Sequence, residues 1–145
     1  MTVKIVKLDQ NAHIPTYGSA SAAGADLYAC IEAPVTIQPG QTVLIPTGLS
    51  MEIEEGFAGF IYARSGLATK RGLAPANKVG VIDSDYRGQV MVSLHNHTGV
   101  AQSVEPGERV AQIVFAPVYQ ASFCEVEALQ NTERGTGGFG STGTK

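Results

Sequence analysis

Two carboxylates, an aromatic ring and a guanidinium lie within five residues near the middle of the chain, at Asp83, Asp85, Tyr86 and Arg87. A carboxylate held rigidly at the end of a strand can act as a general base, and a tyrosine beside it offers a flat face for a ring. Asp, Ser and Gly also fill turns for backbone reasons alone. By itself, this segment therefore fits both a catalytic tip and an ordinary turn.

The sequence on either side of this tip predicts strands. Residues 79–82 are mostly apolar and precede it, and residues 90–95 follow it as an alternating run rich in β-branched side chains. Two such runs around a polar tip that contains glycine are typical of a β-hairpin. We therefore expect the two runs to pair and to hold the tip at their end.

A second candidate site lies where Arg64, Ser65 and Gly66 precede a short segment compatible with a helix. Ser65 occupies the expected N-cap position, and Gly72 is a suitable C-terminal stop. The free N–H groups and positive dipole end of a helix start favour an anion. The alternative is an ordinary capped helix with a surface arginine.

Two polar residues interrupt apolar surroundings. Asp26 has apolar neighbours, and aspartate is unfavourable inside strands, so it is either a cap at a strand end or turn, or a ligand of a metal or water. Gln112 is the one uncharged polar residue in the apolar run 110–118, where it either makes a core hydrogen bond or contacts a ligand. We expect this run to be buried against something beyond the chain.

The C-terminal residues 133–145 combine many glycines with one arginine, one phenylalanine and several hydroxyl groups. Composition alone is typical of a flexible tail. The functional alternative is a mobile strap in which glycines wrap phosphates, Arg134 supplies charge and Phe139 stacks on a ring.

Composition restricts the class of protein. The chain of 145 residues is long enough for one domain with a core, and 17 glycines and 7 prolines divide it into many short segments. Together with the single convincing helix, this pattern predicts an all-β domain, either a barrel or a double-sheet jelly roll. The net charge of −3 argues against a nucleic-acid partner. No stretch is apolar enough for a membrane span, and the two cysteines favour a reducing compartment.

Five segments of the chain together resemble the motifs of the trimeric dUTPase family (deoxyuridine 5′-triphosphate nucleotidohydrolases), in the family's order. These segments are residues 23–29, 63–68, 80–88, 107–112 and 134–143. The resemblance implies a distorted jelly-roll or β-barrel domain over residues 1–130 that assembles as a homotrimer. It also implies a flexible tail, residues 131–145, that closes the active site of a neighbouring subunit.

The activity implied by the resemblance is Mg²⁺-dependent hydrolysis of dUTP to dUMP and pyrophosphate, which limits uracil in DNA and supplies dUMP for dTMP synthesis. The implied location is the cytoplasm, or the nucleus in a eukaryote, because we find no targeting segment in the chain. Asp83 resembles the general base that activates water for attack on the α-phosphorus. Tyr86 resembles the ring that packs against deoxyribose and leaves no room for a 2′-hydroxyl. Asp26 resembles the carboxylate that holds Mg²⁺ through coordinated waters.

The resemblance also implies three groups of substrate contacts. The phosphate contacts are Arg64, Ser65, Gly66 and Gln112; the uracil contacts are Asn77, Gly80, Val81, Ile82 and Met91; the tail contacts are Arg134, Phe139, Gly140, Ser141 and Thr142. Phe139 would stack over uracil, while Ser141 and Thr142 would contact the γ-phosphate.

Two other functions compete with this interpretation. A dCTP deaminase would share the fold and the triphosphate site, but it needs a catalytic glutamate near the base, and residues 80–88 contain none. A non-catalytic regulatory β-trimer would be expected to lack Asp83 or the tail motif, and both are present.

Overall fold

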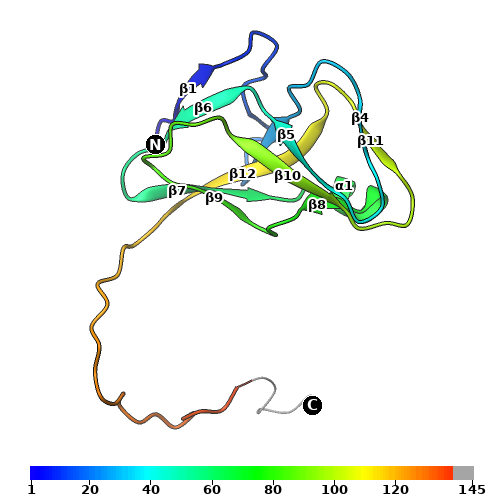
Figure 1. The fold of residues 1–145 in the computed structure, drawn as a ribbon. Helices are drawn as coiled ribbons and strands as arrows, with labels where there is room; N and C mark the ends of the chain where they lie inside the picture. The colour runs from blue at the N-terminus through cyan, green and yellow to red at the C-terminus, as the bar shows by residue number, and fades with distance from the viewer. Residues whose placement is uncertain (139–145) are drawn as a thin grey trace.

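The computed structural model describes residues 1–138, which form twelve strands and one short helix (Figure 1). The elements are β1 Lys4–Lys7, β2 Thr16–Tyr17, β3 Ala25–Tyr28, β4 Val35–Ile37, β5 Thr42–Pro46, β6 Leu49–Glu52, β7 Phe57–Tyr62, α1 Ser65–Arg71, β8 Leu73–Pro75, β9 Gly80–Ile82, β10 Met91–Asn96, β11 Gln102–Val104 and β12 Arg109–Pro117. The prediction of an all-β domain with one short helix is confirmed. Within the part of the chain described, no helix has the length and apolar character needed to cross a membrane.

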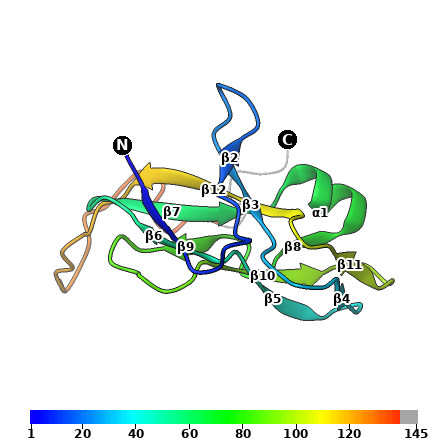
Figure 2. The ribbon, with the colours of Figure 1, turned by 90° about the horizontal axis from the view of Figure 1, so that it is seen from above.

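The strands form four antiparallel sheets, and pairing does not close them into a barrel within residues 1–138. The largest has the order β2-β3-β12-β7-β9, and a second has the order β5-β10-β8. Seen from above, these two sheets lie on opposite sides of the domain (Figure 2). Leu27 and Ile113 of the first sheet and Val92 and Leu94 of the second belong to the same buried core. This shared core holds the two sheets together.

The apolar run of residues 110–118 is explained largely by strand order. β12 lies between β3 and β7, so the chain itself pairs both edges of this strand. Val110, Ala111 and Ile113 are fully buried within the single domain. Burial inside the domain therefore accounts for these three residues without a partner molecule.

The predicted hairpin around Asp83 is wrong. β9 pairs with β7, whereas β10 pairs with β5 and β8, so the two strands enter different sheets. The connection between them is held by local bonds, including the one from the Tyr86 amide to the Asp83 carbonyl oxygen. It is also fixed to β6, because the Ser50 hydroxyl donates to the Arg87 carbonyl oxygen over 2.7 Å. These contacts make the segment a bridge between sheets, where a tight turn was expected.

Helix α1 begins one residue earlier than the sequence predicted. Arg64, with ψ of 129°, is the N-cap, and its carbonyl oxygen accepts the Ala68 amide at 2.9 Å. Ser65 is therefore the first helical residue, and the prediction that it is the cap is wrong. Gly72 ends the helix as predicted, in the left-handed conformation with φ of 60°.

The C-terminal end of α1 is attached to β11 and to the turn that joins β11 to β12. The Arg71 guanidinium donates to the Gln102 side chain over 3.3 Å, to the Ser103 carbonyl oxygen and to the Glu108 carboxylate. Glu108 comes directly before β12. The helix is thus fixed to the strand that also carries Gln112.

Beyond Pro117 the chain has no helix or strand as far as residue 138, and it runs away from the domain (Figure 1). This segment carries large apolar side chains: Tyr119 is 96%, Phe123 98% and Leu129 86% exposed. The boundary at residue 130 between domain and tail stays a prediction.

Candidate functional site

A cleft of about 240 Å³ lies beside the start of α1. Asp26 of β3, Arg64, Ser65 and Gly66 of the helix start, and Gln112 of β12 all line it, so the structure gathers five of the predicted residues. Gly18, Ala22, Gly24 and Arg109 complete the lining.

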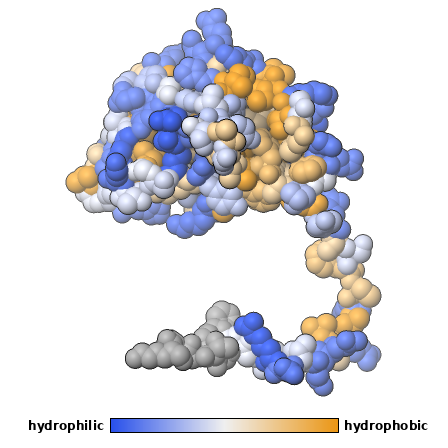
Figure 3. Space-filling model, turned by 180° about the vertical axis from the view of Figure 1, so that it is seen from behind, coloured by the Kyte–Doolittle hydropathy of each residue, from blue (hydrophilic) through white to orange (hydrophobic). Residues whose placement is uncertain are grey.

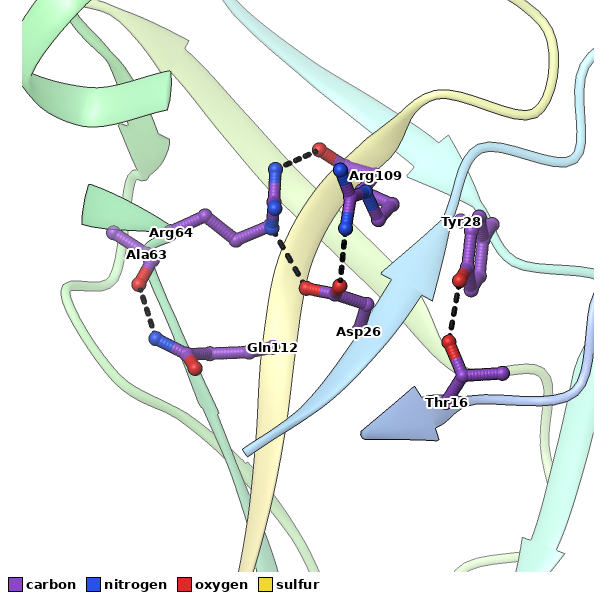
Figure 4. Close-up of polar contacts among 7 residues, drawn as sticks. All are labelled: Thr16, Asp26, Tyr28, Ala63, Arg64, Arg109 and Gln112. Carbon is purple, nitrogen blue, oxygen red and sulfur yellow. Dashed lines mark hydrogen bonds and ion pairs between the residues drawn. The ribbon is translucent and has the colours of Figure 1, made fainter. Parts of the chain in front are cut away.

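Within this cleft, Asp26 is held between two guanidinium groups (Figure 4). Its Oδ1 accepts from Arg64 Nε at 2.7 Å, and its Oδ2 accepts from Arg109 Nη1 at 3.1 Å. Arg64 Nη1 also donates to the Arg109 carbonyl oxygen over 3.4 Å. The Asp26 side chain is only 13% exposed, so these cations compensate a largely buried charge.

Asp26 does not cap a strand end, and that interpretation is wrong. It lies inside β3, opposite Thr16 of β2 and Gln112 of β12. Two arginines and one carboxylate give this part of the cleft an excess of positive charge. Because α1 has only seven residues, this charge depends on the side chains more than on the helix dipole.

A β-bulge in β12 determines which side chains reach Asp26. The register between β12 and β3 shifts between Arg109 and Ala111. Val110 and Ala111 are consecutive and both fully buried, whereas Arg109 and Gln112 both line the cleft. The extra residue breaks the strand's alternation and turns both polar side chains to the side of Asp26.

Sequence reasoning missed Arg109. The one feature of the sequence that marked Arg109 was a positive charge directly before the apolar run of β12. A strictly alternating strand would place Val110, and not Arg109, on the face of Gln112. The register shift that reverses this expectation leaves no distinctive pattern in a single sequence.

Gln112 is partly buried, and its amide has a hydrogen-bond partner. Its Nε2 donates to the Ala63 carbonyl oxygen at 2.9 Å, directly before Arg64 (Figure 4). This contact links β12 to the segment that delivers Arg64 to the cleft.

Asp83 does not lie in this cleft. It lines a separate hollow of about 910 Å³ with the turn between β6 and β7 and with residues 118–120, which follow β12. Since Ile82 pairs with Gly59, Asp83 follows β9 beside the beginning of β7, while Arg64 follows the other end of β7. At ~3.3 Å per residue, the six residues from position 58 to position 64 correspond to about 20 Å. One chain therefore keeps Asp83 far from its own Arg64.

Around Asp83, Tyr86 is 43% exposed, and its hydroxyl donates to the Gln89 carbonyl oxygen at 3.0 Å. The connection is tight here, since a β-carbon at Gly88 would lie 2.3 Å from Tyr86 Oη. The ring is thus fixed at its edge while much of its surface remains accessible.

The predicted uracil contacts lie on or beside β9 and β10. Asn77 Nδ2 would be 3.4 Å from a β-carbon at Gly80, so this side chain lies against the start of β9. In the described residues, β9 is an edge strand whose outer side has no strand partner, and this leaves main-chain groups of Val81 and Ile82 available. Met91 begins β10 in the facing sheet and is partly buried.

The tail contacts are placed only in part. Arg134 Nε donates to the Gly137 carbonyl oxygen at 2.8 Å, and neither cleft includes Arg134. Phe139, Gly140, Ser141 and Thr142 lie outside the described residues.

The structure thus combines an all-β fold with a cleft of net positive charge beside the start of its one described helix. A dUTPase family model matches residues 10–143. The chain is 49% identical over 144 residues to a deoxyuridine 5′-triphosphate nucleotidohydrolase of Thiobacillus denitrificans, covering 99% of each chain. It is 46% identical over 144 residues to the enzyme of the same name from Paraburkholderia phymatum, covering 99% of this chain and 97% of that one. The chain belongs to the dUTPase family.

A solved structure agrees in fold. The dUTPase of Staphylococcus bacteriophage 80alpha with dUpNHpp matches this chain with a TM-score of 0.89 and 26% sequence identity, covering 98% of both chains. The dUTPase from phage phi11 of S. aureus has a TM-score of 0.81 at 22% identity and shares the fold.

Proposed function

We propose that this protein hydrolyses dUTP to dUMP and pyrophosphate by attack of water on the α-phosphorus. The observation that carries the proposal is the cluster of Asp26, Arg64 and Arg109 in a cleft beside the helix start, in a chain of the dUTPase family. The names of its bacterial relatives and the dUpNHpp of the phage dUTPase support the same substrate.

The cleft suits a triphosphate. A guanidinium has five N–H donors, and Arg64 uses one at Nε and one at Nη1, so three remain for phosphate oxygens. Ser65 adds a hydroxyl, and among the described residues no atom outside the chain neighbours and the helix backbone lies within 4 Å of a β-carbon placed at Gly66, so phosphate can approach the backbone closely. Gln112, held at Ala63, completes this set of phosphate contacts.

The same cleft fits Mg²⁺ bound together with the nucleotide. Asp26 is the one carboxylate that lines it, and no group of three or more His, Cys, Asp or Glu in residues 1–138 forms a cage for a metal. Mg²⁺ characteristically uses one or two carboxylates with water and substrate phosphates. Asp26 would hold the ion through its waters, and the bound ion would neutralise charge on the triphosphate.

At the other site, Asp83 would take a proton from the attacking water, and the exposed face of Tyr86 would pack against the deoxyribose. The outer edge of β9 would read uracil through main-chain groups. A fixed pattern of donors and acceptors there rejects cytosine, whose amino group is a donor where uracil has an acceptor.

The separation of Asp83 from Arg64 supports a site shared between subunits. A triphosphate is too short to reach both residues of one chain at about 20 Å. We therefore infer a homotrimer in which one subunit supplies Asp83, a second supplies the phosphate cleft, and the tail, residues 131–145, closes the site of a neighbour. The exposed apolar side chains in residues 119–129, a segment visible in Figure 3, support contact with another copy because nothing in residues 1–138 covers them.

The decisive experiment supplies dUTP, UTP and each of the four standard deoxynucleoside triphosphates with Mg²⁺ and measures pyrophosphate. We expect rapid release from dUTP alone. Ammonia from dCTP would instead identify a deaminase, and no product from any nucleotide would favour a regulatory protein. We place the activity in the cytoplasm, which the free thiols of Cys30 and Cys124 support.

A further inference from the structure

Each oxygen of the Asp26 carboxylate is bonded to a different cation. Arg64 holds Oδ1 and Arg109 holds Oδ2. If the proposed function is right, Arg64 also binds phosphate through its remaining N–H donors, so its guanidinium is shared between Asp26 and the arriving triphosphate. Arg109, in contrast, is bonded to Oδ2, the carboxylate oxygen that Arg64 does not contact. We propose that Arg109 is a positioning residue that keeps the Asp26 carboxylate correctly oriented while Arg64 engages the substrate.

The backbone of β12 supports this role for Arg109. The β-bulge turns Arg109 to the side of Asp26 at the point where β12 pairs with β3. The Arg109 carbonyl oxygen also accepts from Arg64 Nη1, so the same residue contacts both partners. The Arg109 side chain is 51% exposed, and its bond to Asp26 is its one side-chain hydrogen bond within residues 1–138. The contact with Asp26 is therefore the specific interaction that its removal would abolish.

The environment of Asp26 shows why a second cation is needed. With 13% of its side chain exposed, Asp26 has little water to stabilise its charge. A carboxylate in such a place that loses its partner is strongly destabilised and turns away from its position. With Arg109 present, the carboxylate retains a partner on Oδ2 at every stage.

This proposal differs from two simpler roles for Arg109. Arg109 could add positive charge that attracts any triphosphate, or it could only stabilise the β-bulge. Only a role through Asp26 predicts that the effects of altering Arg109 and Asp26 are strongly coupled.

The test is a double-mutant cycle of Arg109→Gln and Asp26→Asn, with binding of dUpNHpp measured by calorimetry in Mg²⁺ and in EDTA. In Mg²⁺ we expect Arg109→Gln to weaken binding about tenfold or more, and in EDTA by much less. In the Asp26→Asn background, Arg109→Gln should change the affinity by less than about twofold. Additive effects, or equal losses in Mg²⁺ and EDTA, would overturn the proposal.

Two further variants and one stability measurement complete the design. Lys4→Gln removes the same charge from an exposed pair with Glu52, and it should leave binding unchanged. Arg109→Lys should restore part of the Mg²⁺-dependent affinity. Thermal unfolding distinguishes positioning from a purely structural role of Arg109. A lowered Tm with unchanged binding of dUpNHpp would reject positioning. Wild-type protein that neither binds dUpNHpp nor hydrolyses dUTP would refute the proposed function itself, whereas an active wild type with unaffected Arg109 variants refutes only this inference.

Discussion

The α-carbon of Gly24 lies against the carboxamide of Gln112, so that a β-carbon at position 24 would be 2.4 Å from Gln112 Oε1. No side chain fits there without displacing the glutamine. Since Gln112 Nε2 is bonded to the Ala63 carbonyl oxygen, its displacement would also disturb the segment that leads to Arg64.

Gly24→Ala should therefore raise the KM for dUTP about tenfold, because one phosphate contact is lost and Arg64 is less well held. Steady-state kinetics measure this effect. Gly18→Ala is the matched control: Gly18 lines the same cleft, yet among the described residues no atom beyond its chain neighbours lies within 4 Å of the position of a β-carbon there. Equal kinetics for the two variants would contradict the assignment of Gln112.

Asp83→Asn should reduce turnover by about two to four orders of magnitude while preserving nucleotide binding, because the amide cannot accept the proton of water. Single-turnover pyrophosphate release and calorimetry with dUpNHpp measure the two quantities separately. Asp85→Asn, two residues along the same connection, provides the comparison. Near-native turnover of Asp83→Asn would show that another group is the base.

Tyr86→Ala should raise the kcat/KM for UTP relative to that for dUTP. The ring is fixed by its hydroxyl at Gln89, so its removal opens space beside the sugar where a 2′-hydroxyl can fit. Tyr86→Phe keeps the ring and loses only the bond to Gln89, and we expect it to retain most of the preference for dUTP. An unchanged ratio for the alanine variant would exclude Tyr86 as the sugar-discriminating residue.

Removal of all residues after Gln130 should leave a folded assembly with steeply reduced activity. The deleted segment contributes no helix or strand among the residues described, so little stability depends on it. Closure over the substrate would be lost, together with the charge of Arg134. Circular dichroism, mass in solution and pyrophosphate release give the three readouts.

Mixing these truncated subunits with full-length Asp83→Asn subunits then tests whether sites are shared. If a tail closes a neighbour's site, mixed trimers contain sites with an intact Asp83 and a donated tail, and activity reappears after refolding. If each tail serves its own chain, nothing is recovered. Native mass spectrometry confirms that mixed trimers are present in either case.

Much of the local structure was predictable where short-range chemistry decides it. Gly72 ends α1 because a left-handed residue is needed there, and glycine provides it at low cost. Ser65 was misplaced by one position because the backbone of Arg64, without a side-chain bond, suffices as cap. The pairing of β9 was not predictable, since local alternation gives the face of a strand but not its partner.

The candidate site also divides into residues that local sequence identifies and residues that only strand pairing brings together. Asp26, Arg64 and Gln112 were identifiable by residue type, because charge and amide groups in apolar surroundings need partners. Arg109 joins them through a bulge, which is a register property of two strands distant in sequence. Likewise, only the pairing of β7 with β9 reveals how far Asp83 lies from Arg64.

The length of β7 has a consequence for when the protein can act. Under the proposed function, a newly made subunit carries the parts of two unfinished sites and can complete neither by folding alone. Catalysis then begins only with association, and the law of mass action makes the fraction of competent sites a function of subunit concentration. The six-residue length of β7 would thus keep every unassembled subunit catalytically inactive.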